Sequence, residues 1–380
     1  MMYYFCIFLF VLTQYSRAYL KNGDRKVTRL VDINKIYASA DSTDTVSRSY
    51  FYKYNKNQKI QIHYERKGND NNPVLLFIPG FGVGTYHYNN QFENLSDKFC
   101  IYSLDLLGQG KSWPITSINE NDNFTYDINS WRDQIIDFVE TIVKKPVHIC
   151  GNSLGGFLSI ACASYNPKLF KSITLLNSTP FWAFRTENFI TKFIWNGRLP
   201  APKSYLSFGS SYFNLLKNAN TIKSMLSLVY YNKNSISDQL ISNIIDSASN
   251  AYGAEAFTSI LFSSKYHMDF DQMLDLLKGT IHICMIYGKD DPWVNPFWGN
   301  AAFNKLERNI PYFQLHSTGH CPADESPSTV NAILSEYINC IEMNNTMIVK
   351  SSKVFEELKS KFDKKYIQEQ THQVYINIIQ

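Results

Sequence analysis

The chain has 380 residues, of which 44% are hydrophobic and 18% are charged. This composition supports a packed core and excludes a chain that is disordered throughout, and the length suits one large domain with appendages or two small domains. The formal net charge of +4 is modest, and the lysines and arginines are scattered along the chain. We therefore expect no nucleic acid among the partners, because a nucleic-acid site leaves a cluster of basic residues.

The N-terminus has the features of a targeting segment. Tyr3 to Leu12 form an apolar stretch that is too short to span a bilayer and matches the hydrophobic region of a signal peptide. We assign residues 1–18 to a signal peptide and residues 19–49, which are basic and lack periodicity, to a leader that acts as a transit segment. This combination is typical of delivery into a plastid, and the alternative is the secretory pathway or export from the cell.

From residue 50 the chain alternates between strand and helix patterns. Helical spacing runs from Ile128 to Val143, with apolar residues on one face. Continuous apolar strands that alternate with helices predict an α/β fold, a mostly parallel central sheet with helices on both faces. The strands are expected at Tyr50–Tyr54, Lys59–Glu65, Val74–Ile78, Phe99–Leu104, Val147–Cys150, Ser172–Leu176, Ile281–Tyr287 and Tyr312–His316.

The alternation breaks between residues 181 and 271, where aromatic residues are frequent. We interpret this segment as a helical cap inserted after the sixth strand, above the site. The alternative is a helical subdomain whose aromatic side chains form a core of their own. Residues 50–180 and 272–342 then form the main domain, and residues 343–380 form a C-terminal appendage with amphipathic spacing in Val354–Lys365.

The most informative motif is G-x-S-x-G, spelled Gly151-Asn152-Ser153-Leu154-Gly155. It follows the apolar strand Val147–Cys150 and precedes the helix-forming run Phe157–Ala163. A nucleophile elbow requires this order of strand, tight turn and helix, and the glycines are needed because the serine sits on a strained turn. We therefore predict that Ser153 is a catalytic nucleophile.

A serine hydroxyl attacks only when a base removes its proton, and the base is a histidine oriented by a carboxylate. Asp291 follows the strand Ile281–Tyr287, and His320 follows the strand Tyr312–His316. Open α/β sheets place their sites at these carboxyl ends, and the chain order Ser, acid, His is the one that this elbow uses. We predict Asp291 as the acid and His320 as the base.

Other candidates fit this pattern less well. Asp290 is adjacent to Asp291, but the Gly-x-x-acid spacing from Gly288 favours Asp291. The loop after the preceding strand offers Asn177, which cannot carry the charge that compensates an imidazolium. The other histidines lack a position after the last strand: His63, His87, His148, His267, His282, His316 and His372.

Two backbone N–H groups are expected to form an oxyanion hole, those of Leu154 and of Phe81 in the turn Pro79–Gly84. This glycine-rich turn lacks the Walker lysine and the dinucleotide spacing, so we expect no cofactor. The chain contains no H-E-x-x-H motif and no Cys/His cluster, so we expect no metal. Four cysteines are expected in the core rather than in disulfides: Cys100, Cys150, Cys162 and Cys284.

Several segments beyond these residues resemble the pheophytinase-like α/β-hydrolases, a plastid esterase family of chlorophyll breakdown. The resemblance implies the α/β-hydrolase fold, a serine esterase that releases phytol from a magnesium-free chlorophyll derivative, and triad positions for Ser153, Asp291 and His320. The cap, residues 185–270, departs from the family. The matching segments are Phe77–Gly84, Leu104–Gly110, Trp131–Gln134, Leu175–Trp182, Tyr287–Val294 and Gly319–Glu325.

We interpret the chain as a serine-dependent carboxylic ester hydrolase for an ester with a large apolar part, working with a membrane surface as partner to reach a lipid-like substrate. One alternative is a carbon–carbon bond hydrolase or an acyltransferase on the same triad. Another is a non-catalytic protein that binds an apolar ligand. Dehalogenase and epoxide hydrolase chemistry is disfavoured because it uses a carboxylate nucleophile. The sequence leaves the oligomeric state open.

Overall fold

The computed structural model describes residues 44–53, 59–118, 124–178, 195–264, 266–294, 296–344 and 351–379. The predicted signal peptide, residues 1–18, and the predicted leader up to residue 43 lie outside these residues. None of the helices in the described ranges has both the length and the apolar character needed to cross a membrane.

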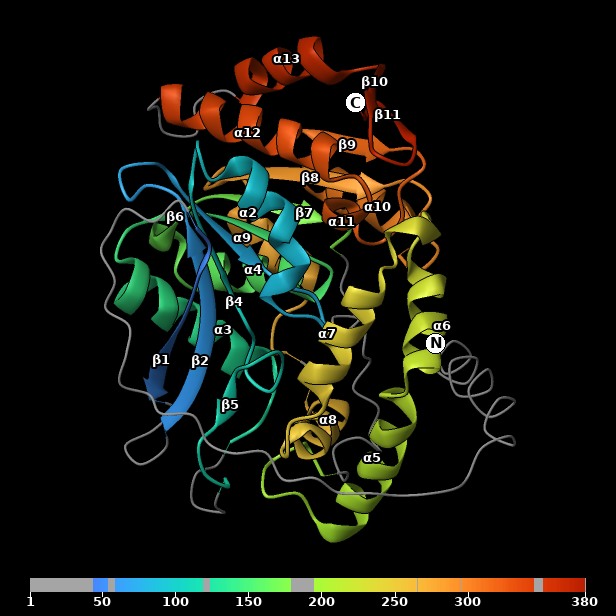
Figure 1. Ribbon diagram of the computed structural model, residues 1–380. Helices are drawn as coiled ribbons and strands as arrows, with labels where there is room; N and C mark the ends of the chain where they lie inside the picture. Colours follow the sequence, from blue (N-terminus) through green and yellow to red (C-terminus); the bar gives the residue numbers. More distant parts are fainter. Residues whose placement is uncertain are drawn as a thin grey trace. The chain divides into compact units, whose positions relative to one another are not determined.

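Within the described residues, eleven strands form one mixed sheet (Figure 1). They are β1 (Val46–Lys53), β2 (Lys59–Lys67), β3 (Val74–Ile78), β4 (Cys100–Leu104), β5 (Trp113–Pro114), β6 (Val147–Asn152), β7 (Phe170–Leu176), β8 (His282–Gly288), β9 (Tyr312–Leu315), β10 (Lys365–Gln368) and β11 (Gln373–Ile378). The order is β1-β2-β4-β3-β6-β7-β8-β9-β11-β10, and β5 pairs with β2. Neighbours from β4 to β9 are parallel, and the pairs at both edges are antiparallel.

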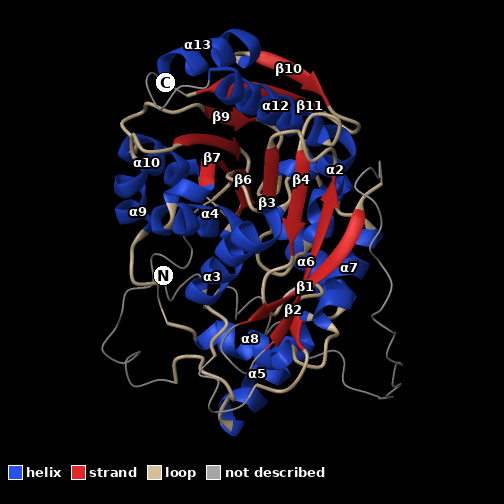
Figure 2. Cartoon of the chain, turned by 90° about the vertical axis from the view of Figure 1, so that its left-hand side faces the viewer, coloured by secondary structure: helices blue, strands red, loops and turns tan. Residues whose placement is uncertain are grey.

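Helices cover both faces of this sheet (Figure 2). One face carries α3 (Ile128–Phe138), α4 (Leu154–Tyr165), α9 (Phe270–Leu277) and α10 (Pro296–Lys305). The other carries α2 (Asn89–Leu95), α12 (Pro327–Asn344) and α13 (Ser351–Phe362). The prediction of a mostly parallel sheet with helices on both faces is therefore confirmed.

The central strand β3 explains why its sequence is apolar at every position. Leu76 and Ile78 pack into the core beneath α3 and α4, whereas Leu75 and Phe77 pack into the core beneath α2 and α12. Successive side chains of a strand point to opposite faces, so a strand covered on both sides needs a continuous apolar run.

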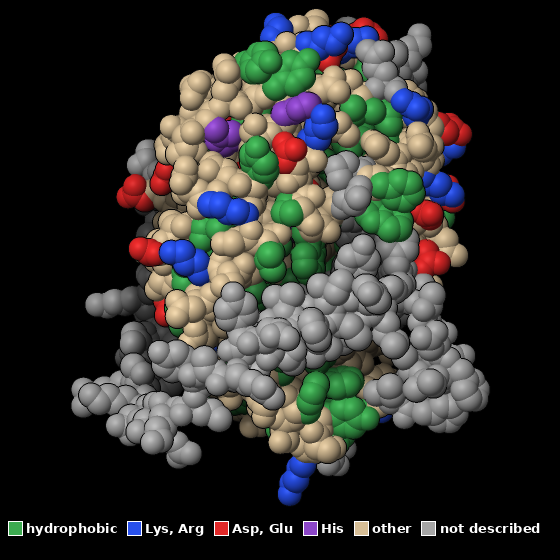
Figure 3. Space-filling view, turned by 90° about the vertical axis from the view of Figure 1, so that its right-hand side faces the viewer, with side chains coloured by type: hydrophobic (Ala, Val, Ile, Leu, Met, Phe, Trp, Pro, Cys, Tyr) green, Lys and Arg blue, Asp and Glu red, His purple; other side chains and the backbone are tan. Residues whose placement is uncertain are grey.

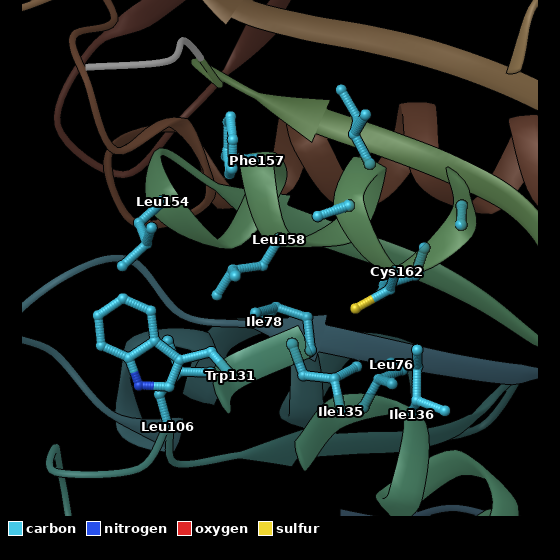
Figure 4. Close-up of a cluster of buried hydrophobic side chains, with 14 of the residues drawn as sticks. Leu76, Ile78, Leu106, Trp131, Ile135, Ile136, Leu154, Phe157, Leu158 and Cys162 are labelled. Atoms are coloured by element: carbon cyan, nitrogen blue, oxygen red, sulfur yellow. The ribbon is translucent and has the colours of Figure 1, made fainter. Parts of the chain in front are cut away.

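Helix α4, which follows Ser153, is held by the core on one side of the sheet. Figure 4 shows Leu154, Leu158 and Cys162 along α4, with Trp131 and Ile135 of α3 opposite them. Burying one such apolar side chain contributes about 1.5–3 kcal/mol. The start of α4 is therefore fixed by packing, and with it the position of the residue before the helix.

Four helices lie between β7 and β8, in the segment expected to form a cap: α5 (Lys203–Leu216), α6 (Ala219–Val229), α7 (Asp238–Ala248) and α8 (Gly253–Phe262). Several aromatic side chains on these helices and in the segment just before α5 contact one another. The rings of Trp195 and Tyr205 are 5.2 Å apart, and those of Tyr205 and Phe262 are 4.9 Å apart. These three half-buried aromatic residues contact one another within the segment, and both the cap and the alternative of a helical subdomain stay predictions. The predicted aromatic residues Phe181–Phe193 lie outside the described residues.

Both ends of the described chain extend the sheet further than the sequence predicts. Strand β1 begins at Val46, so residues 46–49, which we expected in the leader, pair with β2. In the predicted appendage, the amphipathic segment forms α13, but β10 and β11 are additional strands, and β11 pairs with β9. These strands were missed because they are short and partly exposed, and β10 has no apolar run.

The appendage is tied to the main domain by a buried carboxylate. Glu369, between β10 and β11, accepts hydrogen bonds from the Thr329 N–H (2.7 Å), the Thr329 hydroxyl (2.6 Å) and the Ser328 N–H (3.2 Å). These N–H groups belong to the first turn of α12, where they have no partner within the helix. A carboxylate at this end also interacts favourably with the helix dipole.

We expect Glu369→Ala to lower the free energy of unfolding by about 1–3 kcal/mol, because it leaves buried donors without an acceptor. Urea denaturation measures the change. The matched control is Gln370→Ala at the adjacent exposed position, which should leave stability unchanged. Equal stability of both variants would contradict the role of Glu369.

Candidate active site

Ser153 lies at the tight turn between β6 and α4, as the motif predicts. Its backbone has φ 54° and ψ −116°, and its N–H donates to the Leu176 carbonyl oxygen of β7 at 3.0 Å. A non-glycine residue with positive φ is uncommon and costs about 1–3 kcal/mol, so the surrounding structure must enforce it. The strained backbone holds the serine at the carboxyl end of the sheet.

Gly155 of the motif and the adjacent Gly156 allow the turn to be this tight. A Cβ atom on Gly155 would overlap the carbonyl oxygen of Ile78 in β3, and a Cβ on Gly156 would overlap the Ser178 hydroxyl. Neither neighbour can move without disturbing the sheet or the loop after β7. Only glycine therefore fits, which is the physical reason for the spacing seen in the sequence.

Asp291 and His320 are brought together as predicted. His320 Nδ1 lies 2.8 Å from Asp291 Oδ2, and both residues are buried. The other carboxylate oxygen, Oδ1, accepts the N–H groups of Trp293 (2.7 Å) and Val294 (2.8 Å). The carboxylate is therefore fixed by its own loop and presents one oxygen to the imidazole.

Asn177, which we rejected as the acid, instead supports it. Its side-chain amide donates to Asp291 Oδ2 at 2.7 Å, and its side-chain oxygen accepts the Gly288 N–H at 2.8 Å. The residue has φ 41°, a conformation that asparagine tolerates better than most residues. Its position directly after β7 was the only sign of this role in the sequence.

The segment of the serine contacts the segment of the histidine directly. The side-chain amide of Asn152 donates to the carbonyl oxygen of His320 at 2.8 Å and to that of Leu176 at 2.9 Å. Since Asn152 precedes Ser153, these bonds hold the elbow beside the loop of His320. The catalytic roles of Ser153, Asp291 and His320 stay predictions.

The predicted oxyanion groups border the same serine. A Cβ atom on Gly80 would lie 3.7 Å from Ser153 Cβ, so the turn that contains Phe81 runs next to Ser153. Leu154 is the first residue of α4, and the first N–H groups of a helix have no partner within it. Their function as oxyanion donors stays a prediction.

Two buried side chains that the sequence did not reveal hold this turn. Gln109 accepts the Gly82 N–H at 2.6 Å, and Asp105 Oδ1 accepts the Thr85 N–H at 2.7 Å. Asp105 also accepts the Lys111 N–H through Oδ2 at 2.8 Å. The segment Leu104–Gly110 was noticed only for its resemblance, and its function here is to fix the turn after β3.

Asp105 belongs to a second row of Ser, His and Asp, that is, three side chains linked in series by hydrogen bonds. His63 Nδ1 lies 2.8 Å from Asp105 Oδ2, and His63 Nε2 lies 2.7 Å from the hydroxyl of Ser47. Ser47 is an exposed residue of the edge strand β1, whereas Ser153 precedes a helix N-terminus that supplies N–H donors. This difference favours Ser153 as the nucleophile and makes Ser47 a useful control.

Two further features bear on the chemistry of the protein, its cysteines and its groups of possible metal ligands. The cysteines expected in the core, Cys100, Cys150, Cys162 and Cys284, are buried, as predicted. Over the described ranges, no group of three or more His, Cys, Asp or Glu side chains is arranged to hold a metal ion.

The chain belongs to the α/β-hydrolase family, since the sequence model described as "alpha/beta hydrolase fold" matches residues 73–327. Its similarity to pheophytinase is confirmed: it is 33% identical to "Pheophytinase, chloroplastic" of Arabidopsis thaliana over 75% of this chain. The match covers 65% of that protein, so the chain spans less than two thirds of its length.

Other relatives carry different names. The human "(Lyso)-N-acylphosphatidylethanolamine lipase" is 23% identical over 76% of this chain and 85% of its own length. The structure of 2-hydroxy-6-oxo-6-phenylhexa-2,4-dienoate hydrolase from Rhodococcus superposes with a TM-score of 0.58 at 16% identity, covering 78% of this chain and all of the other. The family match and the similarity to pheophytinase support a hydrolase, and the structural superposition confirms the α/β-hydrolase fold.

The loop of His320 is held by a further buried carboxylate, Glu325. It accepts N–H groups of Gly319 and Cys321 from that loop, and of Tyr231 and Asn232 from the cap. Burial raises the pKa of Glu325 to about 7 from its ordinary 4.5, although the four N–H donors oppose this rise. Among titratable side chains, Cys321 lies beside Glu325, and Asp324 and Tyr230 lie beside Cys321 in turn.

This shift predicts a pH dependence of stability. The folded carboxyl group keeps its proton to a higher pH than the unfolded one, so the free energy of unfolding falls as pH rises from 4.5 through 7. At 1.36 kcal/mol per pKa unit the loss is at most about 3 kcal/mol. We expect Glu325→Gln to lack this fall in the free energy of unfolding. Urea denaturation at pH 5 and at pH 8 measures it.

The matched control is Glu93→Gln, which makes the same chemical change at an exposed position of α2. An exposed side chain contributes little to stability. The Glu93→Gln variant should therefore keep the wild-type difference in the free energy of unfolding between pH 5 and pH 8. A Glu325→Gln variant with that same difference would contradict the raised pKa.

Proposed function

We propose that the protein is a serine-dependent carboxylic ester hydrolase for an ester with a large apolar part, with the phytyl ester of pheophytin as the leading candidate. The observation that carries the proposal is the buried Asp291–His320 pair beside the strained Ser153 elbow. A hydroxyl, an imidazole and a carboxylate in this order form the machinery of acyl transfer on several unrelated folds.

In the proposed reaction, Ser153 Oγ attacks the ester carbonyl carbon while His320 Nε2 takes the hydroxyl proton. Asp291 holds the Nδ1–H and stabilises the imidazolium. The N–H groups of Phe81 and Leu154 donate to the oxyanion as the tetrahedral intermediate forms, each contributing about 3 kcal/mol.

Collapse of this intermediate breaks the bond to the alcohol oxygen, which takes the proton from His320 and leaves as the alcohol. Water then repeats the sequence on the acyl-enzyme, with His320 as the base. The products are the free acid and the free alcohol, and Ser153 regains its proton.

Two observations support an apolar substrate. The first is the similarity to a pheophytinase. The second is a pair of large aromatic side chains next to the site: Phe81 is 42% exposed and Trp293 is 44% exposed. These side chains follow the first parallel strand or Asp291, at the edge of the sheet where the substrate arrives.

We further propose that the protein works in a plastid and meets its substrate at a membrane surface. The plastid proposal is supported by the chloroplastic relative and by the basic leader. On the side of α6, hydrophobic side chains occur in several separate patches (Figure 3). Leu228 and Tyr231 of the cap are 52% and 51% exposed.

We expect Ser153→Ala to lower kcat for an activated acyl ester at least about 10⁴-fold, and Asp291→Asn to lower it by about 10²–10⁴-fold. The reason is that the first change removes the nucleophile and the second leaves the imidazole without its partner. Hydrolysis rates, together with mass-spectrometric mapping of a fluorophosphonate adduct, provide the measurement.

Two variants serve as matched controls. Asp290→Asn changes the neighbouring exposed acid, and Ser47→Ala changes the serine of the second Ser–His–Asp row. Both should keep the wild-type rate. A fluorophosphonate adduct on Ser47, together with activity retained in Ser153→Ala, would refute the assignment of Ser153 as the nucleophile.

For the substrate, we expect purified protein to release phytol from pheophytin in detergent micelles, and Ser153→Ala to release none. Product analysis by liquid chromatography measures this beside a short acyl ester and a vinylogous diketone. Turnover of the short ester alone would refute pheophytin but keep the esterase. Cleavage of the diketone alone would favour carbon–carbon hydrolysis, and tight pheophytin binding without any turnover would favour a non-catalytic binder.

A further inference from the structure

The cap contacts the loop of the catalytic base through its backbone. The His320 N–H donates to the carbonyl oxygen of Val229, the last residue of α6, at 3.1 Å. A Cβ atom on Gly319 would lie 2.5 Å from the Tyr231 nitrogen and 2.9 Å from the Val229 oxygen. The backbones of the two segments are therefore in direct contact at Gly319 and His320.

One carboxylate joins both segments. Glu325 Oε2 accepts the N–H groups of Tyr231 and Asn232 of the cap, each at 2.9 Å, and that of Gly319 at 3.1 Å. Its Oε1 accepts the Cys321 N–H at 3.2 Å. Glu325 is only 2% exposed, so these bonds are shielded from water. The two N–H groups on either side of His320 thus share an acceptor with the cap.

Further polar contacts surround this junction. The Tyr230 hydroxyl of the cap donates to Asp324 Oδ2 at 2.8 Å and lies 3.2 Å from His87 Nε2. The Asn232 amide donates to the Thr371 hydroxyl, in the turn between β10 and β11, at 2.8 Å. The C-terminal appendage therefore touches the cap at the place where the cap touches the loop of the base.

We propose that Glu325 is a positioning residue that locks the loop of His320 to the end of α6, so that the catalytic base is in place only while the cap is seated. This proposal rests on the proposed function of His320 as the base. A carboxylate has about four acceptor sites, whereas glutamine has one oxygen and an NH₂ group that would face N–H donors. Glutamine at position 325 therefore breaks the shared contact without changing the volume of the side chain.

The test compares Glu325→Gln with the wild type on a small activated ester at pH 8, where the Glu325 carboxyl group, with a pKa of about 7, has lost its proton. We expect kcat to fall about 10- to 100-fold, because small displacements of a catalytic group are costly, while KM changes less than about twofold. Ser153 should still react with a fluorophosphonate, more slowly. Glu342→Gln makes the same chemical change elsewhere and should keep the wild-type kcat. A destabilised Glu325→Gln protein with full kcat would overturn the proposal.

A second measurement does not depend on catalysis. Hydrogen exchange should accelerate together in the peptides that cover residues 226–235 and 316–326 of Glu325→Gln, while the peptide that covers α12 stays protected. If the wild type hydrolyses no ester, the proposed function fails, and this coupled exchange still decides whether the two segments are locked together. Exchange that is unchanged, or that accelerates in only one of the two peptides, would refute the lock.

If Glu325→Gln does not fold, Tyr230→Phe tests the same junction with a smaller change. It removes only the hydroxyl that binds Asp324, and we expect kcat to fall about two- to tenfold with KM unchanged. A wild-type kcat, with wild-type exchange in both peptides, would count against the coupling of cap and base.

Discussion

The strained backbone at Ser153 is the constraint on which the rest of the site depends. A positive φ at a serine persists only where neighbouring segments leave the chain no other path. Here Gly155 lies against β3, Gly156 lies against the loop after β7, and the apolar side of α4 is buried against α3. The packing of the sheet therefore supplies the energy that keeps the hydroxyl at the edge of the sheet.

Buried carboxylates organise the surrounding loops in a common way. Asp105 accepts hydrogen bonds from the N–H groups of two turns, and Asp291 accepts them from its own loop. Glu325 accepts them from the cap and from the loop of His320. Glu369 does the same for the appendage and α12. Each charge costs free energy to bury, and several N–H donors offset that cost while fixing segments that are distant in sequence.

The sequence predicted the elements whose local pattern is strong. Strand β3 was predicted with the observed bounds because five successive apolar residues lie between Pro73 and Pro79. Strands β10 and β11 were missed because they are short, partly polar and stabilised by pairing at the edge of an existing sheet. The aromatic residues of the cap were predicted as a group, but their sequence could not tell which of them pack on one another.

The sequence by itself determined the α/β fold, the elbow at Ser153 and the order of Ser153, Asp291 and His320, because local spacing and the ends of predicted strands carry that information. Only the tertiary structure decided that Asn177 binds Asp291, that Asp105 and Gln109 hold the turn of Phe81, and that Glu325 joins the cap to the loop of His320. These roles depend on which backbone N–H groups meet one side chain in space. No local pattern encodes that meeting, because the donors come from segments that are brought together only when the sheet, the cap and the appendage fold.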